Sequence, residues 1–353
     1  MTSTVNTDSL WLRSKQWDLI WISGSALLMV VPYLSYYTGS ALGLNATDAR
    51  NAVNILVAFF IGGPHMYATH TRTTFDGEFS KAHATLLPMA ILIPSFVIYM
   101  GLANFQMLLT LFFFWASIHV LHQIIYLVDL YNNRDPRPLS WWSRASDYAV
   151  VLLALYPIAT YRFVHGSFNV GEVFLYFPEQ LKHDATWIAV ALLFALAVTT
   201  FAFKTVQEFK TGRGNWPKLI LISITVLASF VTPMFHELDV AFQGLNTWHS
   251  FQYLGITWYV NRLRYERGEL TAPLIKKLSA PKKWYKFYGF SLMLNSTTLV
   301  VWAGLLMTQQ HHGLTFDQSY YMVVLCFLLT HYYHDHLLFR NTHEVREIAI
   351  RTA

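Results

Sequence analysis

The sequence has few charged residues, a single cysteine and no leader-like start. Only 13% of its 353 residues are charged and 54% are hydrophobic, whereas soluble domains carry about 25% charged residues. This shortage argues against an ordinary soluble domain. Cys326 alone supplies neither a disulfide nor a cysteine-rich metal motif, so any metal would be held by nitrogen and oxygen. The first 16 residues lack the basic start, apolar core and cleavage site of a signal peptide, and we expect the first apolar stretch to be a retained helix.

Apolar stretches long enough to cross a membrane recur along the whole chain. A spanning helix needs about 20 residues, and unpaired backbone groups are costly in lipid, so spans are expected to be helical. We therefore predict an all-α, polytopic integral membrane bundle that forms one domain over residues 1–353. The ten predicted spans are 17–41, 51–70, 84–103, 105–131, 146–165, 185–208, 217–235, 240–262, 284–309 and 319–340.

Positive charge is distributed unevenly between the predicted loops. With the N-terminus inside, all but three of the 25 lysines and arginines fall on the inner side; only Arg50, Arg162 and Lys182 lie outside. The inner side then includes the tails 1–16 and 341–353 and a basic loop, 263–283. Because lysine and arginine favour the cytoplasmic side, we predict cytoplasmic termini in a bacterial inner membrane. The net charge of +5 follows from this asymmetry and implies no nucleic acid. The basic loop is expected either to contact anionic membrane lipids or to act only as a topology signal.

Histidine is abundant, with fifteen residues. Ionisable residues inside a membrane are candidates for function, and histidine is the commonest metal ligand. Five histidines fall on four predicted spans that run in the same direction, at depths of roughly 9 to 20 Å from the cytoplasmic ends. This shared depth predicts one buried metal site in the cytoplasmic half of the bundle. The predicted histidine ligands are His65, His119, His122, His249 and His331.

Local spacing adds detail to this site. His331 and Asp335 are four residues apart and share a helical face, which makes Asp335 a candidate carboxylate ligand. Pro64 lies in the IGGPH sequence just before His65, where it is expected to break or kink the helix and free carbonyl groups. Metal-bound imidazoles usually need hydrogen-bonding neighbours. The possible additional ligands are His70, His334 and His336, and the candidate supporting residues are Asn246, Gln252 and Tyr253.

Nitrogen-rich ligation with one carboxylate suits one or two non-haem iron ions, with zinc and copper as other candidates. Iron activates dioxygen, whereas zinc supports hydrolytic chemistry. A lipophilic substrate and dioxygen both partition into a bilayer, so we favour an iron-dependent oxygenase. No catalytic residue is assigned beyond the ligands, and the electron donor stays open.

Two other classes of function remain open. The first is a haem-b electron carrier with two axial histidines, for instance His119 and His249. The second is a metal or proton-coupled transporter whose histidines titrate along a path. In the transporter, the outer histidines would form the entry, or a second site. These outer histidines are His165, His236, His311 and His312. For any single deep histidine, interhelical hydrogen bonding is the simpler explanation.

Four short motifs resemble, in order, the histidine-bearing helices of the Brp/Blh-type membrane β-carotene dioxygenases. They are IGGPHMYATH, SIHVLHQ, TWHSFQY and LLTHYYHDH. The resemblance implies iron ligands at His65, His119, His249 and His331 and a carotenoid substrate cleaved with dioxygen. This chain departs from the family by having more spans and by carrying His70 where an acid is expected. We therefore expect the substrate to be a carotenoid, another polyene or a lipid chain.

Overall fold

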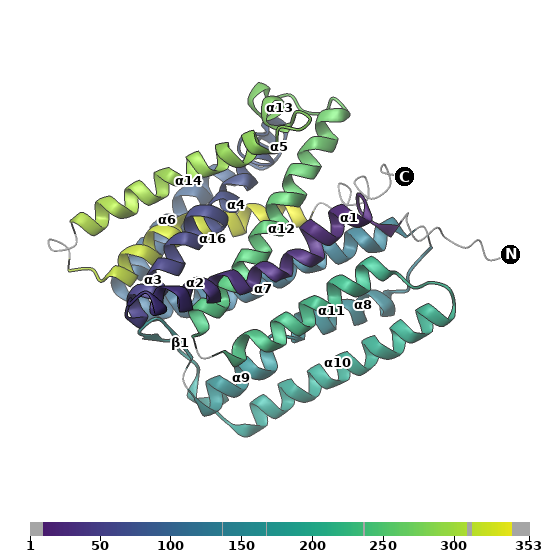
Figure 1. The fold of residues 1–353 in the computed structure, drawn as a ribbon, viewed down its shortest axis with the longest axis horizontal. Helices are drawn as coiled ribbons and strands as arrows, with labels where there is room; N and C mark the ends of the chain where they lie inside the picture. The colour runs from purple at the N-terminus through teal and green to yellow at the C-terminus, as the bar shows by residue number, and fades with distance from the viewer. Residues whose placement is uncertain (1–9, 136, 167, 236, 309–312, 341–353) are drawn as a thin grey trace. The chain divides into compact units, whose positions relative to one another are not determined.

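The computed structural model describes residues 10–135, 137–166, 168–235, 237–308 and 313–340. Within these ranges the protein is almost entirely helical, with one short β-hairpin (Figure 1). The elements are α1 (Lys15–Asp18), η2 (Leu19–Ser23), η3 (Gly24–Met29), α2 (Val30–Ala41), α3 (Ala46–Val57), η4 (Ala58–Gly62), α4 (Gly63–Ala68), η5 (Thr69–Thr71), α5 (Gly77–Ala82), α6 (Leu86–Ala103), α7 (Phe105–Arg134), α8 (Trp141–Leu153), α9 (Tyr156–His165), β1 (Asn169–Val170), β2 (Val173–Phe174), η6 (Glu179–Leu181), α10 (Asp184–Lys210), α11 (Trp216–Val231), η7 (Thr232–Met234), α12 (Leu238–Glu266), α13 (Pro273–Ser279), α14 (Trp284–Met307) and α16 (Phe316–Phe339).

Among the described residues, eight helical segments are long and apolar enough to cross a membrane. They are Lys15–Ala41, Ala46–Thr71, Leu86–Ala103, Phe105–Arg134, Trp141–His165, Asp184–Lys210, Trp216–Met234 and Trp284–Met307. Each coincides with a predicted span, and the chain is an all-α integral membrane protein. The α12 and α16 helices lie where the eighth and tenth spans are predicted, but they are less apolar than these eight. They are also the helices that carry His249 and His331.

The chain forms two compact units, each assembled from separate segments. Unit 1 comprises Met1–Val31, Trp115–Trp248 and Asn341–Ala353, and unit 2 comprises Pro32–Phe114 and His249–Arg340. Three of the boundaries fall inside α2, α7 and α12, so each of these helices contributes residues to both units. That residues 1–353 form a single domain stays a prediction.

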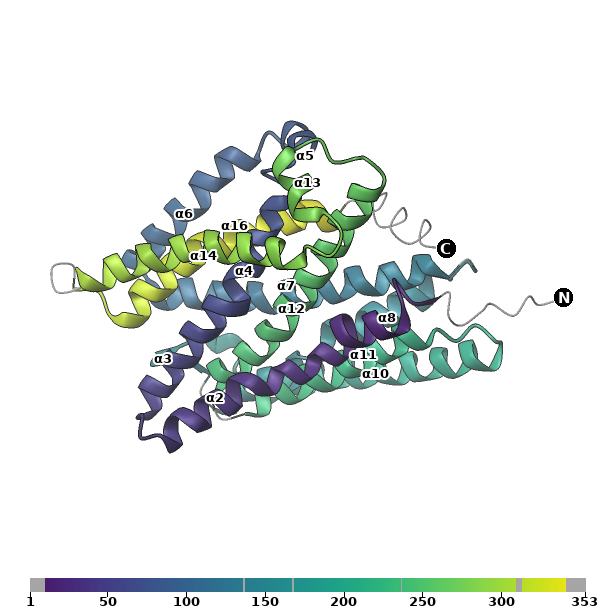
Figure 2. The same ribbon diagram turned by 45° about the horizontal axis from the view of Figure 1, so that its top comes forward.

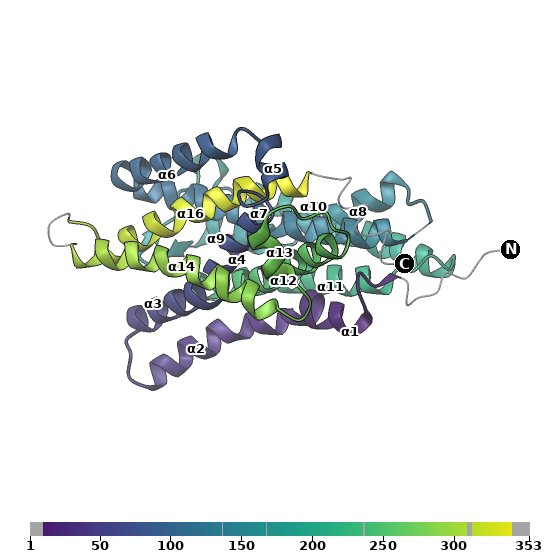
Figure 3. The same ribbon diagram turned by 90° about the horizontal axis from the view of Figure 1, so that it is seen from above.

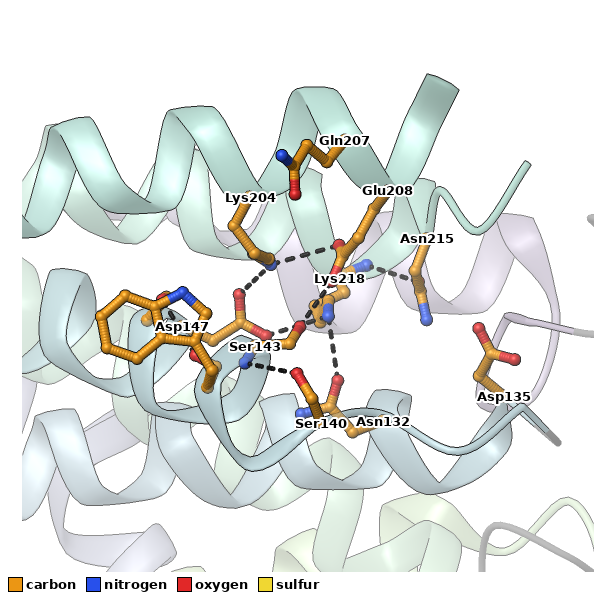
Figure 4. A network of polar contacts seen from close by, with 12 residues as sticks. Asn132, Asp135, Ser140, Ser143, Asp147, Lys204, Gln207, Glu208, Asn215 and Lys218 are labelled. Atoms are coloured by element: carbon orange, nitrogen blue, oxygen red, sulfur yellow. Dashed lines mark hydrogen bonds and ion pairs between the residues drawn. The ribbon is translucent and has the colours of Figure 1, made fainter. Parts of the chain in front are cut away.

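In unit 1, α10 packs along α8 and α9, and α11 packs against the same two helices (Figure 1). A buried ionic network joins these helices (Figure 4). Asp147 of α8 accepts hydrogen bonds from Lys204 of α10 at 2.5 Å and from Lys218 of α11 at 2.9 Å. Lys218 also donates to Asn132 of α7 at 3.0 Å. Buried charges are tolerated when they are paired in this way, so the network fixes how the helices of unit 1 pack.

In unit 2, α14 packs against α4 and α16, and α6 packs along α16 (Figure 3). Figure 2 shows α3 continuing towards α4 through η4, a π-helical turn. Pro64 has no N–H to donate to Phe60, and the hydroxyl of Tyr288 in α14 donates to that carbonyl at 2.6 Å. The side-chain amide of Asn295 donates to the carbonyls of Ala58 and Phe59 at 2.9 and 3.2 Å. The predicted distortion before His65 is confirmed, and side chains of α14 bind carbonyls of this turn, of which that of Ala58 also accepts the Gly63 N–H.

Candidate metal centre

Three imidazoles from three different helices meet in the interior of unit 2. His65 lies on α4, His249 on α12 and His331 on α16, and all three are at most 2% exposed. One potential ligand atom from each lies within 4.8 Å of the others. The ring centroid of His65 is 5.2 Å from that of His249 and 4.6 Å from that of His331. These three residues form the centre of the candidate site.

A carboxylate adjoins the three rings. Asp335 is fully buried one helical turn after His331, and its Oδ2 is 3.4 Å from His331 Nε2. Two ligand atoms bound at about 2.1 Å to one tetrahedral ion are separated by about 3.4 Å. The spacing of this pair therefore matches that of neighbouring ligands, as the sequence spacing predicted.

Contacts of Nδ1 fix the orientation of the His65 ring. Its Nδ1 is hydrogen-bonded to the carbonyl oxygen of Gly62 and lies 2.9 Å from Ser250 Oγ. Because the carbonyl can only accept, Nδ1 carries the proton, and Nε2 presents its lone pair. No described residue hydrogen-bonds to this buried Nε2. Such an arrangement is the one that metal-ligating histidines adopt.

A threonine hydroxyl connects His331 to the carboxylate. Thr69 Oγ1 lies 2.7 Å from His331 Nδ1 and 3.1 Å from Asp335 Oδ1. A hydroxyl has one proton to donate and can also accept. The consistent assignment is that His331 Nδ1 donates to Thr69 and that Thr69 donates to Asp335. His331 Nε2 is then deprotonated and faces the site.

The side chain of Tyr253 completes this network. It is 1% exposed, and its hydroxyl donates to Asp335 Oδ1 at 2.6 Å. Its ring centroid lies 5.7 Å from that of His65 and 5.4 Å from that of His331. Both hydrogen bonds to the carboxylate thus fall on Oδ1, on the opposite oxygen from the one beside His331 Nε2. That Tyr253 supports a metal ligand stays a prediction, with which this hydrogen bond agrees.

These groups fit a transition-metal ion. Nitrogen atoms bound at about 2.1 Å to one ion lie at most about 4.2 Å apart, so small side-chain adjustments bring the three imidazoles, which lie within 4.8 Å of one another, onto a common ion. Imidazole and carboxylate donors suit iron, zinc, copper and nickel. All four side chains are buried, which limits the access of bulk water. The site can therefore hold one ion and leave coordination positions for small ligands.

Other predicted site residues lie elsewhere. His119 is buried and His122 half-buried on the part of α7 that belongs to unit 1, and their participation as ligands stays a prediction. Asn246 also belongs to unit 1, where it donates to Gln243 at 3.1 Å. Gln252 is buried in unit 2, and the side chain of His336 is exposed on α16.

The remaining predicted histidines fall into two groups. His70 and His334 lie together in unit 2, with ring centroids 5.1 Å apart. On the predicted outer side, His165 Nε2 lies 3.1 Å from Asp184 Oδ1, so the His165 imidazole has a structural partner. Three other predicted outer histidines lie outside the described residues: His236, His311 and His312.

Thr69 and Ser250 are site residues that sequence reasoning missed. Thr69 stands four residues after His65, and Ser250 directly follows His249. A hydroxyl near each candidate ligand is a usable indication, because imidazole ligands need hydrogen-bonding partners. Threonine and serine are common in membrane helices, however, and their partners here are far away in sequence.

Comparison with known proteins identifies no relative: no family model, curated protein or solved structure matches the chain. The resemblance to the Brp/Blh-type dioxygenases therefore stays a prediction.

Proposed function

We propose that this protein is a membrane-embedded oxygenase whose non-haem iron is held by His65, His249 and His331, with Asp335 as carboxylate ligand. The observation that carries the proposal is the meeting of three buried imidazoles in unit 2, with the His65 and His331 rings oriented through Nδ1. Interhelical hydrogen bonding alone does not account for it, because His65 Nε2 is buried and no described residue bonds to it.

Iron bound at this site would supply the activation of dioxygen. The protein would supply the rest: His65 and His331 present their Nε2 lone pairs, and Thr69 and Tyr253 hold the Asp335 carboxylate through Oδ1. Burial of these groups keeps bulk water away from the reacting centre. Cys326 does not compete for the ion, because its thiol contacts the carbonyl of Pro94.

A lipophilic substrate is the natural partner of such a site. Within unit 2, the apolar segments Leu86–Ala103 and Trp284–Met307 are only 17% and 22% buried over their most apolar stretches, as expected for surfaces in contact with lipid. A carotenoid, another polyene or a lipid chain can reach a buried site from the bilayer together with dioxygen. In this proposal α12 and α16 complete ten spans, with both termini on the cytoplasmic side of a bacterial inner membrane.

Metal analysis with a visible spectrum of the detergent-purified protein tests the proposal. We expect bound iron without the Soret band of a haem. Replacement of His65, His249 or His331 by alanine should each remove this iron. The matched control is His183→Ala, because His183 is exposed at the start of α10 and makes no cap hydrogen bond there.

Three outcomes would overturn the assignment. Iron that remains bound in all three alanine variants would exclude these residues as ligands. A Soret band would instead indicate the haem-b carrier. A metal-free protein that moves cations into proteoliposomes would indicate the transporter.

A further inference from the structure

A second pair of imidazoles lies beside the candidate metal centre in unit 2. His70 follows His65 by five residues, and His334 follows His331 by three. Their ring centroids are 5.1 Å apart in an edge-on arrangement. The two chain segments that bring His65 and His331 together thus continue to bring a second pair of histidines together.

Both rings are held through the same nitrogen. His70 Nδ1 lies 3.0 Å from the hydroxyl of Thr74, and His334 Nδ1 lies 3.0 Å from the hydroxyl of Thr73. Thr73 also donates to the Thr69 carbonyl at 3.0 Å, so its proton is used and His334 Nδ1 must donate to it. His334 Nε2 is therefore the deprotonated nitrogen, as at His331 in the first centre.

The Nε2 atom of His334 indicates that a group could bind here. The side chain is only 2% exposed, and its Nε2 has no hydrogen-bond partner among the described residues. A buried polar atom left without a partner costs about 1–3 kcal/mol, so a histidine that serves only packing would normally have both nitrogens satisfied. A bound group that accepts the Nε2 lone pair removes this cost.

We infer that His70 and His334 form a second metal site, separate from the first and able to take a divalent first-row cation. Two neutral imidazoles suit zinc, copper, iron and nickel. His70 is half-buried, so water can complete the coordination on its side. A deprotonated Nε2 is available on His334, and His70 offers the same kind of nitrogen when its Nδ1 donates to Thr74, a pair of lone pairs that suits a cation better than a hydrogen-bonded organic group. The inference does not depend on the reaction proposed for the first centre.

Zinc binding by the full-length protein in detergent tests this inference. The protein is stripped with chelator and equilibrated with Zn²⁺ alone, and bound zinc is measured by mass spectrometry. We expect about two equivalents for the unmodified chain and about one for either His334→Ala or His70→Ala. His183→Ala, at an exposed histidine outside both sites, is the control and should keep about two.

His65→Ala distinguishes the two sites. If it also keeps about one equivalent, and the His65→Ala/His334→Ala double variant keeps none, the sites are separate. An unchanged zinc content in both His334→Ala and His70→Ala would overturn the second site, and so would the loss of all zinc from either. One equivalent in the unmodified chain, lost only with His65, would leave the proposed first centre intact and remove the second. Because His70 is half-buried, we expect His70→Ala to fold. This variant therefore tests the second metal site even if His334→Ala does not fold.

Discussion

The phenol of Tyr253 donates a 2.6 Å hydrogen bond to Oδ1 of Asp335. The two residues are 82 positions apart, on α12 and α16, and both are buried. Tyr253→Phe removes this bond and keeps the ring. Outer-shell partners of metal ligands typically contribute 10- to 100-fold to affinity, so we expect metal affinity to fall by roughly that factor with the fold retained. Competition with a chelator measures the affinity, and Tyr285→Phe at an exposed position is the control. Unchanged affinity would mean that Asp335 is not held by this bond.

Thr69 links His331 to the same carboxylate. We therefore expect metal binding and stability to depend more on the hydroxyl of Thr69 than on the shape of its side chain. Thr69→Val keeps the branched side chain but removes the acceptor of His331 Nδ1 and one of the two hydrogen bonds to Asp335 Oδ1. We expect a loss of about 1–3 kcal/mol in unfolding free energy together with weaker metal binding. Thr69→Ser restores a hydroxyl and should recover most of both. A serine variant as defective as valine would show that packing, not hydrogen bonding, is the role of this residue.

Gly63 allows α14 to approach the distorted turn closely. A Cβ atom added there would lie 2.0 Å from Asn295 Oδ1, and Asn295 would have to leave the carbonyls that it binds. We expect Gly63→Ala to destabilise the protein by roughly 1–3 kcal/mol and to lower metal occupancy, because His65 is two residues away. Gly289→Ala on α14 meets nothing within 4 Å and should leave the thermal midpoint in detergent unchanged. Equal midpoints for the two variants would contradict this account.

Asp147 is the shared acceptor of two buried lysines in unit 1. Asp147→Asn removes the counter-charge of Lys218 and leaves Lys204 paired with Glu208 alone, and breaking a buried pair by removing one partner costs about 3–5 kcal/mol. We expect a sharp fall in thermal midpoint or in the yield of monodisperse protein. Glu179→Gln is the control, because its ion pair with Lys182 is exposed and such pairs contribute about 0–1 kcal/mol. A mild effect of Asp147→Asn would indicate that water reaches these lysines.

Much of the helical framework can be predicted from the sequence, because membrane spans depend on long apolar runs that are local properties. The distortion before His65 was predictable for the same reason: Pro64 cannot donate to Phe60, whatever surrounds it. The pairing of His331 with Asp335 follows from a spacing of four residues on one helix.

The connections between helices could not be predicted in this way. Thr69 and His331 are 262 residues apart, and their contact depends on how two helices rotate and tilt against each other. The hydrophobic periodicity of the sequence does not determine that rotation. The ionic network around Asp147 was missed for a related reason: Lys204 and Lys218 were interpreted only as topological charge, whereas both are buried against an aspartate.

Contacts between α14 and the π-helical turn Ala58–Gly62 affect the geometry of the candidate metal centre, although none of its proposed ligands lies on α14. A regular α-helix uses its interior carbonyls for its own amides, and its register is then independent of its neighbours. Here Tyr288 binds the Phe60 carbonyl, to which Pro64 cannot donate, and Asn295 binds the carbonyls of Ala58 and Phe59. These contacts couple the position of His65 along its helix to the position of α14. Deleting one residue of α14 between these two contacts would shift them by about 1.5 Å relative to each other. Metal binding should therefore be sensitive to the length of α14 between Tyr288 and Asn295 as well as to the chemistry of these two side chains.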